Sequence, residues 1–185
     1  MWIYQKKLEY PVNIKKTDLK LAKYLLAQYG GSDSELAATL RYMNQRYNMP
    51  DDKGKALLTD IATEELAHLE IIAAMVHQLT KGASVEDFKK NDWGNQFAAH
   101  DSALFWTDSF GVPFTAAYTE TTGDFIADIE SDMAAEQRAR ATYEHLMDLT
   151  NDPDVLGPLS FLRQREIVHY QRFKELRNYY LEKKV

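Results

Sequence analysis

The segment "TEELAHLE", residues 63–70, places a glutamate three residues before a histidine, as Glu65 and His68. The segment "REIVH", residues 165–169, repeats this spacing as Glu166 and His169. Residues three apart on an α-helix point to nearly the same side of it. The two segments therefore predict helices that each present a carboxylate and an imidazole together.

Each motif is preceded by another glutamate at the same distance. Glu35 stands thirty residues before Glu65, and Glu136 stands thirty residues before Glu166. On composition alone, glutamates at both places are expected about once in two hundred cases. The chain thus contains one pattern, a Glu and then Glu-x-x-His, written twice with an offset of 101 residues.

Hydrophobic spacing predicts four long helices, at about 18–48, 54–79, 125–149 and 156–180. Short turns rich in Asp, Pro and Gly join the helices of each pair, so each pair is expected to form an antiparallel hairpin. The pairs are separated by residues 82–120, which is too long for an ordinary loop. We therefore predict an all-α, ferritin-like four-helix bundle with a long crossover between the second and third helices, in a single domain, residues 1–185.

The first helix contains two adjacent glycines, Gly30 and Gly31. Either they end a short helix and Ser32 caps a new one, or they lie inside a continuous helix at a point of close packing. We favour the continuous helix, with Thr17 as a possible N-cap. Its core candidates are Leu21, Tyr24, Leu25, Leu36, Leu40 and Met43.

The crossover is expected to begin with a short helix, because Ser84 and Asp87 resemble a capping box. The aromatic, charge-poor segment 102–119 follows. We expect it to be buried against the bundle or against another chain, since its aromatic residues would otherwise form an unusually large exposed patch. These residues are Phe105, Trp106, Phe110, Phe114 and Tyr118.

The thirty-residue spacing matches the geometry of a helical hairpin. From Glu35 to the helix end at Asn48 the rise is about 20 Å, and from Gly54 to Glu65 it is about 17 Å. Glu65 therefore returns to the height of Glu35, and the second hairpin closes in the same way. All six side chains of the repeated pattern can meet at mid-bundle.

Four buried carboxylates need compensating positive charge, which two divalent ions supply. One Glu from each of two helices, with Glu-x-x-His from each of the other two, is the pattern of di-iron and di-manganese bundles. Sequence symmetry alone makes all six residues ligands, and these ligand types do not separate manganese from iron.

Plainer explanations exist for single residues. Glu35 could complete a capping box in "SDSE", and His68 or His169 alone could be a buried core histidine. Tyr42 and Tyr143 also repeat at the offset of 101, either as hydrogen-bonding partners of ligand carboxylates or as packing residues. Glu64 and Arg165 occupy equivalent positions with opposite charge, so Glu64 is assigned to the solvent or to the surroundings of the site.

Composition excludes several classes of protein. The chain has no cysteine, which excludes disulfides and thiolate metal sites. A net charge of -6 and dispersed basic residues argue against nucleic acid as a partner. No apolar run approaches the ~20 residues of a membrane span, and the N-terminus lacks a usual export signal, so we expect no membrane partner.

The segments "QYGGSDSELAATLRYMNQRY", "TEELAHLEII" and "REIVH", with "HDSALF" in the crossover, resemble the manganese catalases, most closely the short members found in bacterial spore coats. The resemblance covers nearly the whole chain. It implies a disproportionation of hydrogen peroxide to water and dioxygen on two manganese ions per chain. It also implies a homo-oligomer located in the spore coat, possible contacts with other coat proteins, and the cytoplasm as the alternative location.

The resemblance also implies roles for the six residues. Glu65 bridges the two manganese ions, Glu35 and His68 complete one, and Glu136 and His169 complete the other. Glu166 is then a catalytic base just outside the metals. The alternatives are a di-iron oxidoreductase of the same fold and a structural coat protein that keeps a metal site of low activity.

Two features depart from the larger family members. Those proteins continue past the fourth helix with a tail that wraps a neighbouring subunit, whereas this sequence ends at Val185. Some of them carry an arginine where this chain has Ala135. These departures bear on the rate and the oligomer size and leave the metal ligands in place.

Overall fold

The computed structural model describes residues 5–93 and 105–183, where the regular structure is helical. The bundle is built from α1 (Leu19–Gly30), α2 (Glu35–Gln45), α3 (Asp52–Thr80), α5 (Phe125–Asp148) and α6 (Pro153–Lys183). Shorter pieces are η1 (Arg46–Asn48), α4 (Val85–Lys90) and η2 (Ala116–Thr119). One isolated bridge, Thr107 with Pro113, occurs in the described chain. The predicted all-α fold class is confirmed.

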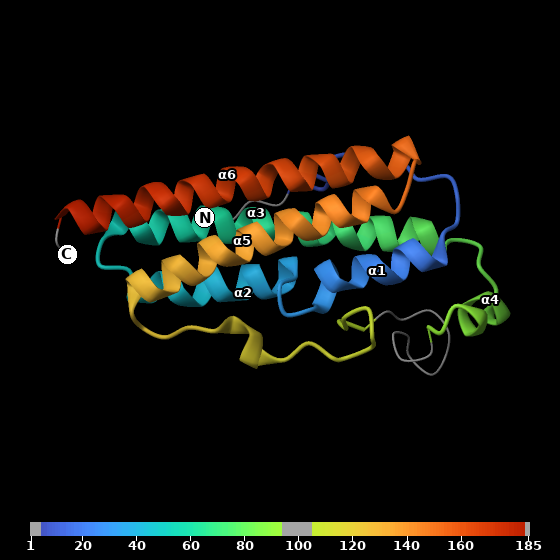
Figure 1. Ribbon diagram of the computed structural model, residues 1–185, viewed down its shortest axis with the longest axis horizontal. Coiled ribbons are helices and arrows are strands. Elements are labelled where there is room, and N and C mark those ends of the chain that lie inside the picture. Colours follow the sequence, from blue (N-terminus) through green and yellow to red (C-terminus); the bar gives the residue numbers. More distant parts are fainter. Residues whose placement is uncertain (1–4, 94–104, 184–185) are drawn as a thin grey trace.

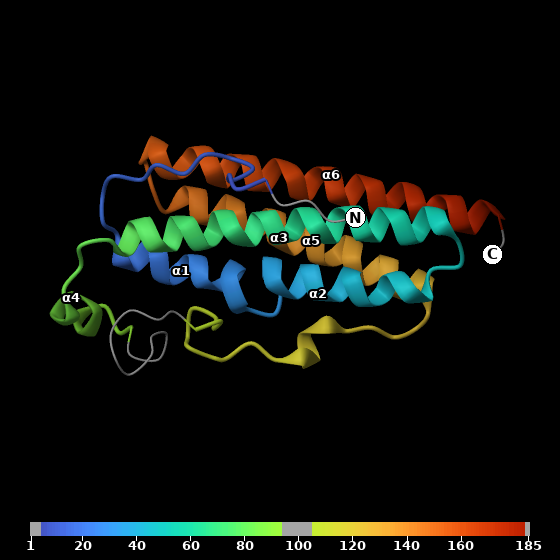
Figure 2. The ribbon, with the colours of Figure 1, turned by 180° about the vertical axis from the view of Figure 1, so that it is seen from behind.

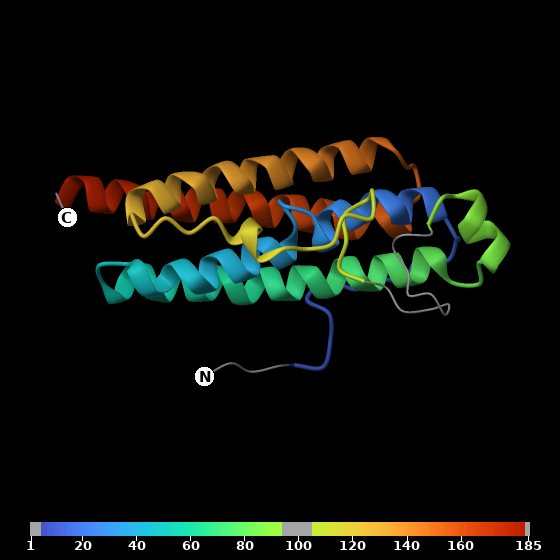
Figure 3. The same ribbon diagram turned by 90° about the horizontal axis from the view of Figure 1, so that it is seen from below.

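The helices form two antiparallel hairpins. α1 and α2 follow one another along the first bundle position, α3 returns beside them, and α5 with α6 makes the second hairpin (Figures 1 and 2). The described part of the crossover, residues 105–124, runs lengthwise along the bundle past α1 and α2 (Figure 3). This is the predicted four-helix bundle with a long connection between its second and third members.

The first bundle position is broken, so the expected continuous helix over 18–48 is wrong. α1 ends at Gly30, and α2 begins at Glu35. The N-cap of α2 is Ser34 and not Ser32. Because Glu35 is the first residue of the helix, it cannot serve as the fourth residue of a capping box in "SDSE".

The break coincides with a close approach of the crossover. A Cβ atom on Gly30 would lie 2.6 Å from the backbone nitrogen of Thr107 and 2.7 Å from the carbonyl carbon of Trp106. Only a glycine leaves room for this backbone. The close packing expected at the glycines is therefore present, but at the end of a helix and not inside one.

Two further details of the first bundle position differ from expectation. Asp18 is the N-cap of α1 in place of Thr17, and its Oδ1 accepts from the backbone N–H of Leu21 at 2.9 Å. Tyr24 and Leu40 are about 40% exposed in the single chain, so they are not core residues there, and Met43 is only half-buried. The other core candidates are buried: Leu21, Leu25 and Leu36.

The apolar core lies in two clusters, one toward each end of the bundle. One cluster contains Leu25, Ile72 and Leu159, and the other contains Leu58 and Phe173. On α3, α5 and α6 the residues of the repeated glutamate and histidine pattern fall between the two clusters. The core therefore encloses a polar layer at mid-bundle.

The crossover starts as predicted with α4, whose capping box joins Ser84 and Asp87. Residues 102–104 of the aromatic segment lie outside the described residues. Phe105 and Trp106 are about half exposed and Phe110 is 85% exposed in the single chain, so burial of these three by the bundle is wrong. Coverage by another chain stays a prediction.

No helix in the described ranges combines the length and the apolar character that crossing a membrane requires.

Candidate metal centre

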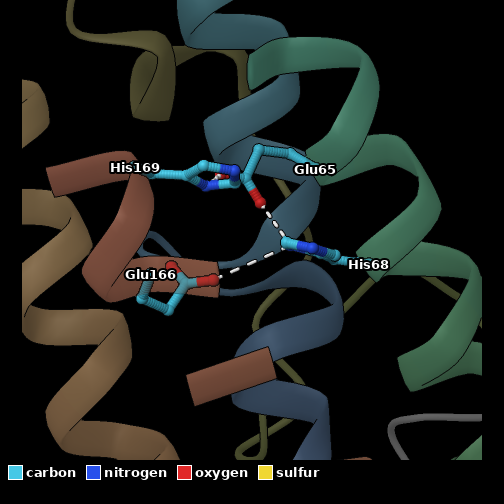
Figure 4. Close-up of side chains that lie close together, drawn as sticks. All are labelled: Glu65, His68, Glu166 and His169. Atoms are coloured by element: carbon cyan, nitrogen blue, oxygen red, sulfur yellow. Dashed lines mark hydrogen bonds and ion pairs between the residues drawn. The ribbon is translucent and has the colours of Figure 1, made fainter. Parts of the chain in front are cut away.

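The six side chains of the repeated pattern meet in the polar layer, and each is at most 2% exposed. Glu35 is the first residue of α2, Glu65 and His68 lie on α3, Glu136 lies on α5, and Glu166 and His169 lie on α6. Four of them are drawn in Figure 4, which shows the paired Glu and His of α3 facing the pair of α6. The spacing within each motif therefore places carboxylate and imidazole on one helix face, as expected.

Glu65 occupies the centre of the group. Its Oε2 lies 2.8 Å from Nδ1 of His68, and its Oε1 lies 2.7 Å from Nδ1 of His169. One carboxylate thus offers one oxygen to each histidine (Figure 4). This is the geometry that a carboxylate needs to bridge two cations.

Glu35 and Glu136 flank this centre in a nearly symmetric way. Oε2 of Glu35 lies 3.7 Å from Nδ1 of His68, and Oε2 of Glu136 lies 3.6 Å from Nδ1 of His169. Each half of the site therefore has one histidine, one outer glutamate and one oxygen of Glu65.

Glu166 breaks the symmetry, because its Oε1 lies 3.7 Å from Nδ1 of His68. Glu65, His68, Glu166 and His169 each offer one donor atom within 4.8 Å of the others. Glu166 is thus near enough to bind a cation and also placed beside a half-site that already has its own glutamate. Its role, ligand or base, stays a prediction.

Two tyrosines hold the outer glutamates in a crossed arrangement. The Tyr42 hydroxyl on α2 donates to Oε1 of Glu136 on α5 at 2.5 Å, and the Tyr143 hydroxyl on α5 donates to Oε1 of Glu35 on α2. Of the two roles that the sequence left open for these tyrosines, the structure shows the hydrogen-bonding one. Each bond fixes one carboxylate oxygen and leaves the other directed at a histidine.

The outward faces of the histidines meet further acids. Nε2 of His169 lies 3.1 Å from Oε2 of Glu64, and Glu64 is also ion-paired with Arg165. Glu64 therefore belongs to the surroundings of the site, one of the two places that the sequence left open for it. Nε2 of His68 lies 3.9 Å from Oε2 of Glu9, a contact that sequence reasoning missed because Glu9 lies in an irregular segment.

Burial and mutual repulsion act on the outer carboxylates. Burial, with the charge of Glu65, raises the pKa of Glu35 to about 8, and the same causes raise the pKa of Glu136 and that of Glu166. Burial would also raise the pKa of Glu65, but the charges of the two histidines outweigh it and hold that pKa well below its usual range. Burial lowers the pKa of His68, yet the charge of Glu65 prevails and raises it to about 10.

The donor set fits two divalent cations. Four carboxylates and two imidazoles surround one small volume, and buried anions that repel one another in this way are stabilised by cations. Glu136 Oε2 and Glu166 Oε1 have no hydrogen-bond partner among the described residues. Oxygen and imidazole donors suit manganese or iron.

A buried aspartate lies close to the six side chains of the candidate centre, and the sequence did not predict it. Asp132 stands one helical turn before Glu136 on α5 and is fully buried. Burial raises the pKa of Asp132 well above its usual range, although the charge of Arg41 opposes the shift. No pattern in the sequence distinguishes Asp132 from the other aspartates of the chain.

The fold and the donor residues match the class of four-helix bundles that hold two metal ions with glutamates and Glu-x-x-His motifs. A model of the family described as manganese containing catalase matches residues 1–182, and the chain belongs to this family. The resemblance stated from the sequence is thus confirmed.

Individual relatives agree with this assignment. The chain is 57% identical over 175 residues to Protein CotJC of Bacillus subtilis, across 95% of this chain and 92% of that protein. It is 37% identical to a probable manganese catalase of Clostridium acetobutylicum, across 90% of this chain and 74% of that one. The crystal structure of KatB, a manganese catalase from Anabaena, matches 95% of this chain and 79% of its own with a TM-score of 0.85 and 33% identity.

Proposed function

We propose that this protein is an active dimanganese catalase that converts two molecules of hydrogen peroxide into two of water and one of dioxygen. The observation that carries the proposal is Glu65, whose two oxygens face one histidine each. Membership of the manganese-containing catalase family supports manganese as the metal.

In this proposal Glu65 would be shared by the two ions, Glu35 and His68 would hold one, and Glu136 and His169 would hold the other. When bound, the metal pair supplies the two-electron exchange that peroxide disproportionation requires. The protein's own groups supply position and protons. The tyrosine bonds hold Glu35 and Glu136 in place, and Glu64 orients the ring of His169 through Nε2.

Glu166 is proposed to handle the protons. One peroxide loses two protons as it becomes dioxygen, and the other gains two as it becomes two waters. Burial, with the charge of Glu65, raises the pKa of Glu166, which makes its carboxylate a better proton acceptor. Oε1 of Glu166 is the proposed atom, since it has no hydrogen-bond partner in the described chain.

The test is to produce the protein with manganese and iron both available, to measure the metal content, and to measure oxygen evolution from peroxide. Two manganese ions per chain with oxygen evolution support the proposal. Two iron ions without oxygen evolution support the di-iron oxidoreductase, and manganese without oxygen evolution supports a structural coat protein. His68→Ala serves as the control, because it should lose at least one metal per chain.

We also propose that the protein acts in the spore coat, as a homo-oligomer that contacts other coat proteins. The sequence resemblance to the short spore-coat members supports this location, and so does the likeness to Protein CotJC over nearly its full length. Fractionation of spores that carry a tagged chain tests it, and recovery of the tag only from the cytoplasmic fraction would contradict it.

A further inference from the structure

A narrow pocket connects the metal centre with the side of the bundle where α2 and α5 meet. Its inner lining includes Glu35, Glu136 and Glu166, and its outer lining includes the half-buried Asp33. The opposite side of the centre is occupied by Glu64 with its ion pairs to Arg165 and His169. The pocket therefore gives a small molecule an approach to the centre from the α2 and α5 side.

Arg41 lies in the wall of this pocket. Its side chain is only 1% exposed, which is rare for arginine unless the charge is paired. One terminal nitrogen, Nη2, donates to the carbonyl oxygen of Tyr118 at 3.0 Å and to Oε2 of Glu120 at 3.2 Å. The crossover thus fixes the far end of the guanidinium.

The Nε–H of Arg41 is not used in these two hydrogen bonds. It is buried and has no hydrogen-bond partner among the described residues. A buried, charged N–H without an acceptor is costly, so it calls for a water molecule or a ligand in the pocket. No carboxylate of the lining lies within hydrogen-bond distance of this Nε–H, including Glu35, Glu136 and Glu166.

Hydrogen peroxide matches this arrangement. It donates two hydrogen bonds and accepts through both oxygens, whereas the carboxylates of the lining only accept when they are ionised. The hydroxyl proton of Tyr42 is directed to Glu136. Arg41 therefore presents the charged donor that a peroxide oxygen needs beside the acidic groups.

We infer that Arg41 binds the incoming peroxide in the pocket through Nε–H and so acts as a substrate-binding residue, with Glu120 holding its guanidinium in position. This inference rests on the proposed function. The same donor should also bind a small anion such as azide, which gives a readout without turnover.

The experiment compares wild type with Arg41→Gln, Arg41→Lys and Arg46→Gln, all loaded with manganese. The last variant removes the same charge from the half-buried Arg46 of η1, which contacts the Tyr47 ring. Metal content, melting temperature, azide affinity from optical titration, and kcat with KM are measured for each. We expect Arg41→Gln to keep two metals, to bind azide at least tenfold more weakly and to raise KM at least tenfold, with Arg41→Lys intermediate and Arg46→Gln unchanged.

Glu120→Gln gives an independent arm that leaves Arg41 itself unchanged. Glu120 is exposed, and without its charge the guanidinium of Arg41 is held less firmly, chiefly by the carbonyl oxygen of Tyr118. Azide should then bind more weakly than in wild type. If Arg41→Gln fails to fold, Glu120→Gln still tests whether Arg41 binds the small anion.

Azide affinity and KM unchanged in Arg41→Gln at full metal content would overturn the inference. So would a loss of azide affinity that always follows a loss of metal, or azide binding that Glu120→Gln leaves unchanged. If wild type evolves no oxygen, the proposed function fails, while the azide titration still tests Arg41.

Discussion

Glu166 has different partners from the other three glutamates of the centre. Glu35 and Glu136 each accept a tyrosine hydroxyl, and Glu65 lies between both histidines. Oε1 of Glu166 has no hydrogen-bond partner in the described part of the chain, and the half-site nearest to it is already complete. A carboxylate placed in this way is suited to move protons rather than to hold a metal.

Glu166→Gln is therefore expected to keep two metals per chain while oxygen evolution falls about 10²- to 10⁴-fold, the usual contribution of a general acid or base. Metal analysis and peroxide turnover on one preparation check this. Glu175→Gln, the same change on the exposed side of α6, is the control. Loss of metal in Glu166→Gln would make Glu166 a ligand, and full occupancy with undiminished turnover would exclude both roles.

The crossed tyrosine bonds lead to a second prediction. Tyr143→Phe removes the donor to Glu35 and leaves the ring in the core. Partners of ligands typically contribute about 10- to 100-fold in metal affinity, so chelator competition should show a loss of that size. Tyr47→Phe, on a ring that is 74% exposed, should change nothing. Equal metal affinity in both variants would reduce Tyr143 to a packing residue.

The sequence was sufficient to find the residues of the centre that follow a repeat. Glu35, Glu65, Glu136 and the two Glu-x-x-His motifs are visible because helical hairpins convert a fixed spacing into a shared height. Arg41 and Glu9 carry no such spacing. Glu9 itself, and the two groups that Arg41 contacts in the crossover, lie outside the long helices, where the path of the chain depends on tertiary packing that sequence reasoning could not place.

At the scale of elements, the break between α1 and α2 is expected to depend on Gly30. Gly30→Ala should lower the free energy of unfolding by about 1–3 kcal/mol, the usual cost of overpacking, because the added carbon meets backbone that cannot rotate away. Urea unfolding measures the change. Gly157→Ala is the matched variant: its Cβ would meet only the end of the Tyr10 side chain, with the hydroxyl nearest at 3.1 Å, so little or no destabilisation is expected.

The helix ranges show where local and distant information differ. α3 and α5 were predicted to within about two residues, because hydrophobic spacing and turn residues are local signals. The end of α1 was not predicted, because the helix stops where the backbone of Thr107, which is far away in sequence, approaches Gly30. The two adjacent glycines indicated a close approach of another segment, but the sequence does not identify that segment as the crossover.

At the scale of the whole molecule, the exposed aromatic residues of the crossover predict assembly. Phe105, Trp106 and Phe110 lie on one short segment and are half or more exposed in the single chain. Apolar groups gathered in this way usually mark a contact with another protein. We expect a homo-oligomer in which a second copy covers them.

Phe110→Asp should therefore shift the protein toward smaller species in sedimentation velocity, while the metal content stays unchanged. Leu149→Asp, at a residue after α5 that is 57% exposed, should leave the assembly intact. A wild-type protein that sediments as a monomer would show that this surface serves another purpose.

The crossed bonds Tyr42 to Glu136 and Tyr143 to Glu35 also make the two hairpins interdependent. Each hairpin carries the hydroxyl that steadies the other hairpin's carboxylate, and Glu65 of the first contacts His169 of the second. Fragments 1–93 and 94–185, produced separately, should then hold manganese weakly or not at all and regain it when mixed. Manganese binding would then measure the reassembly of the two fragments, because neither fragment alone contains all the residues of the candidate site.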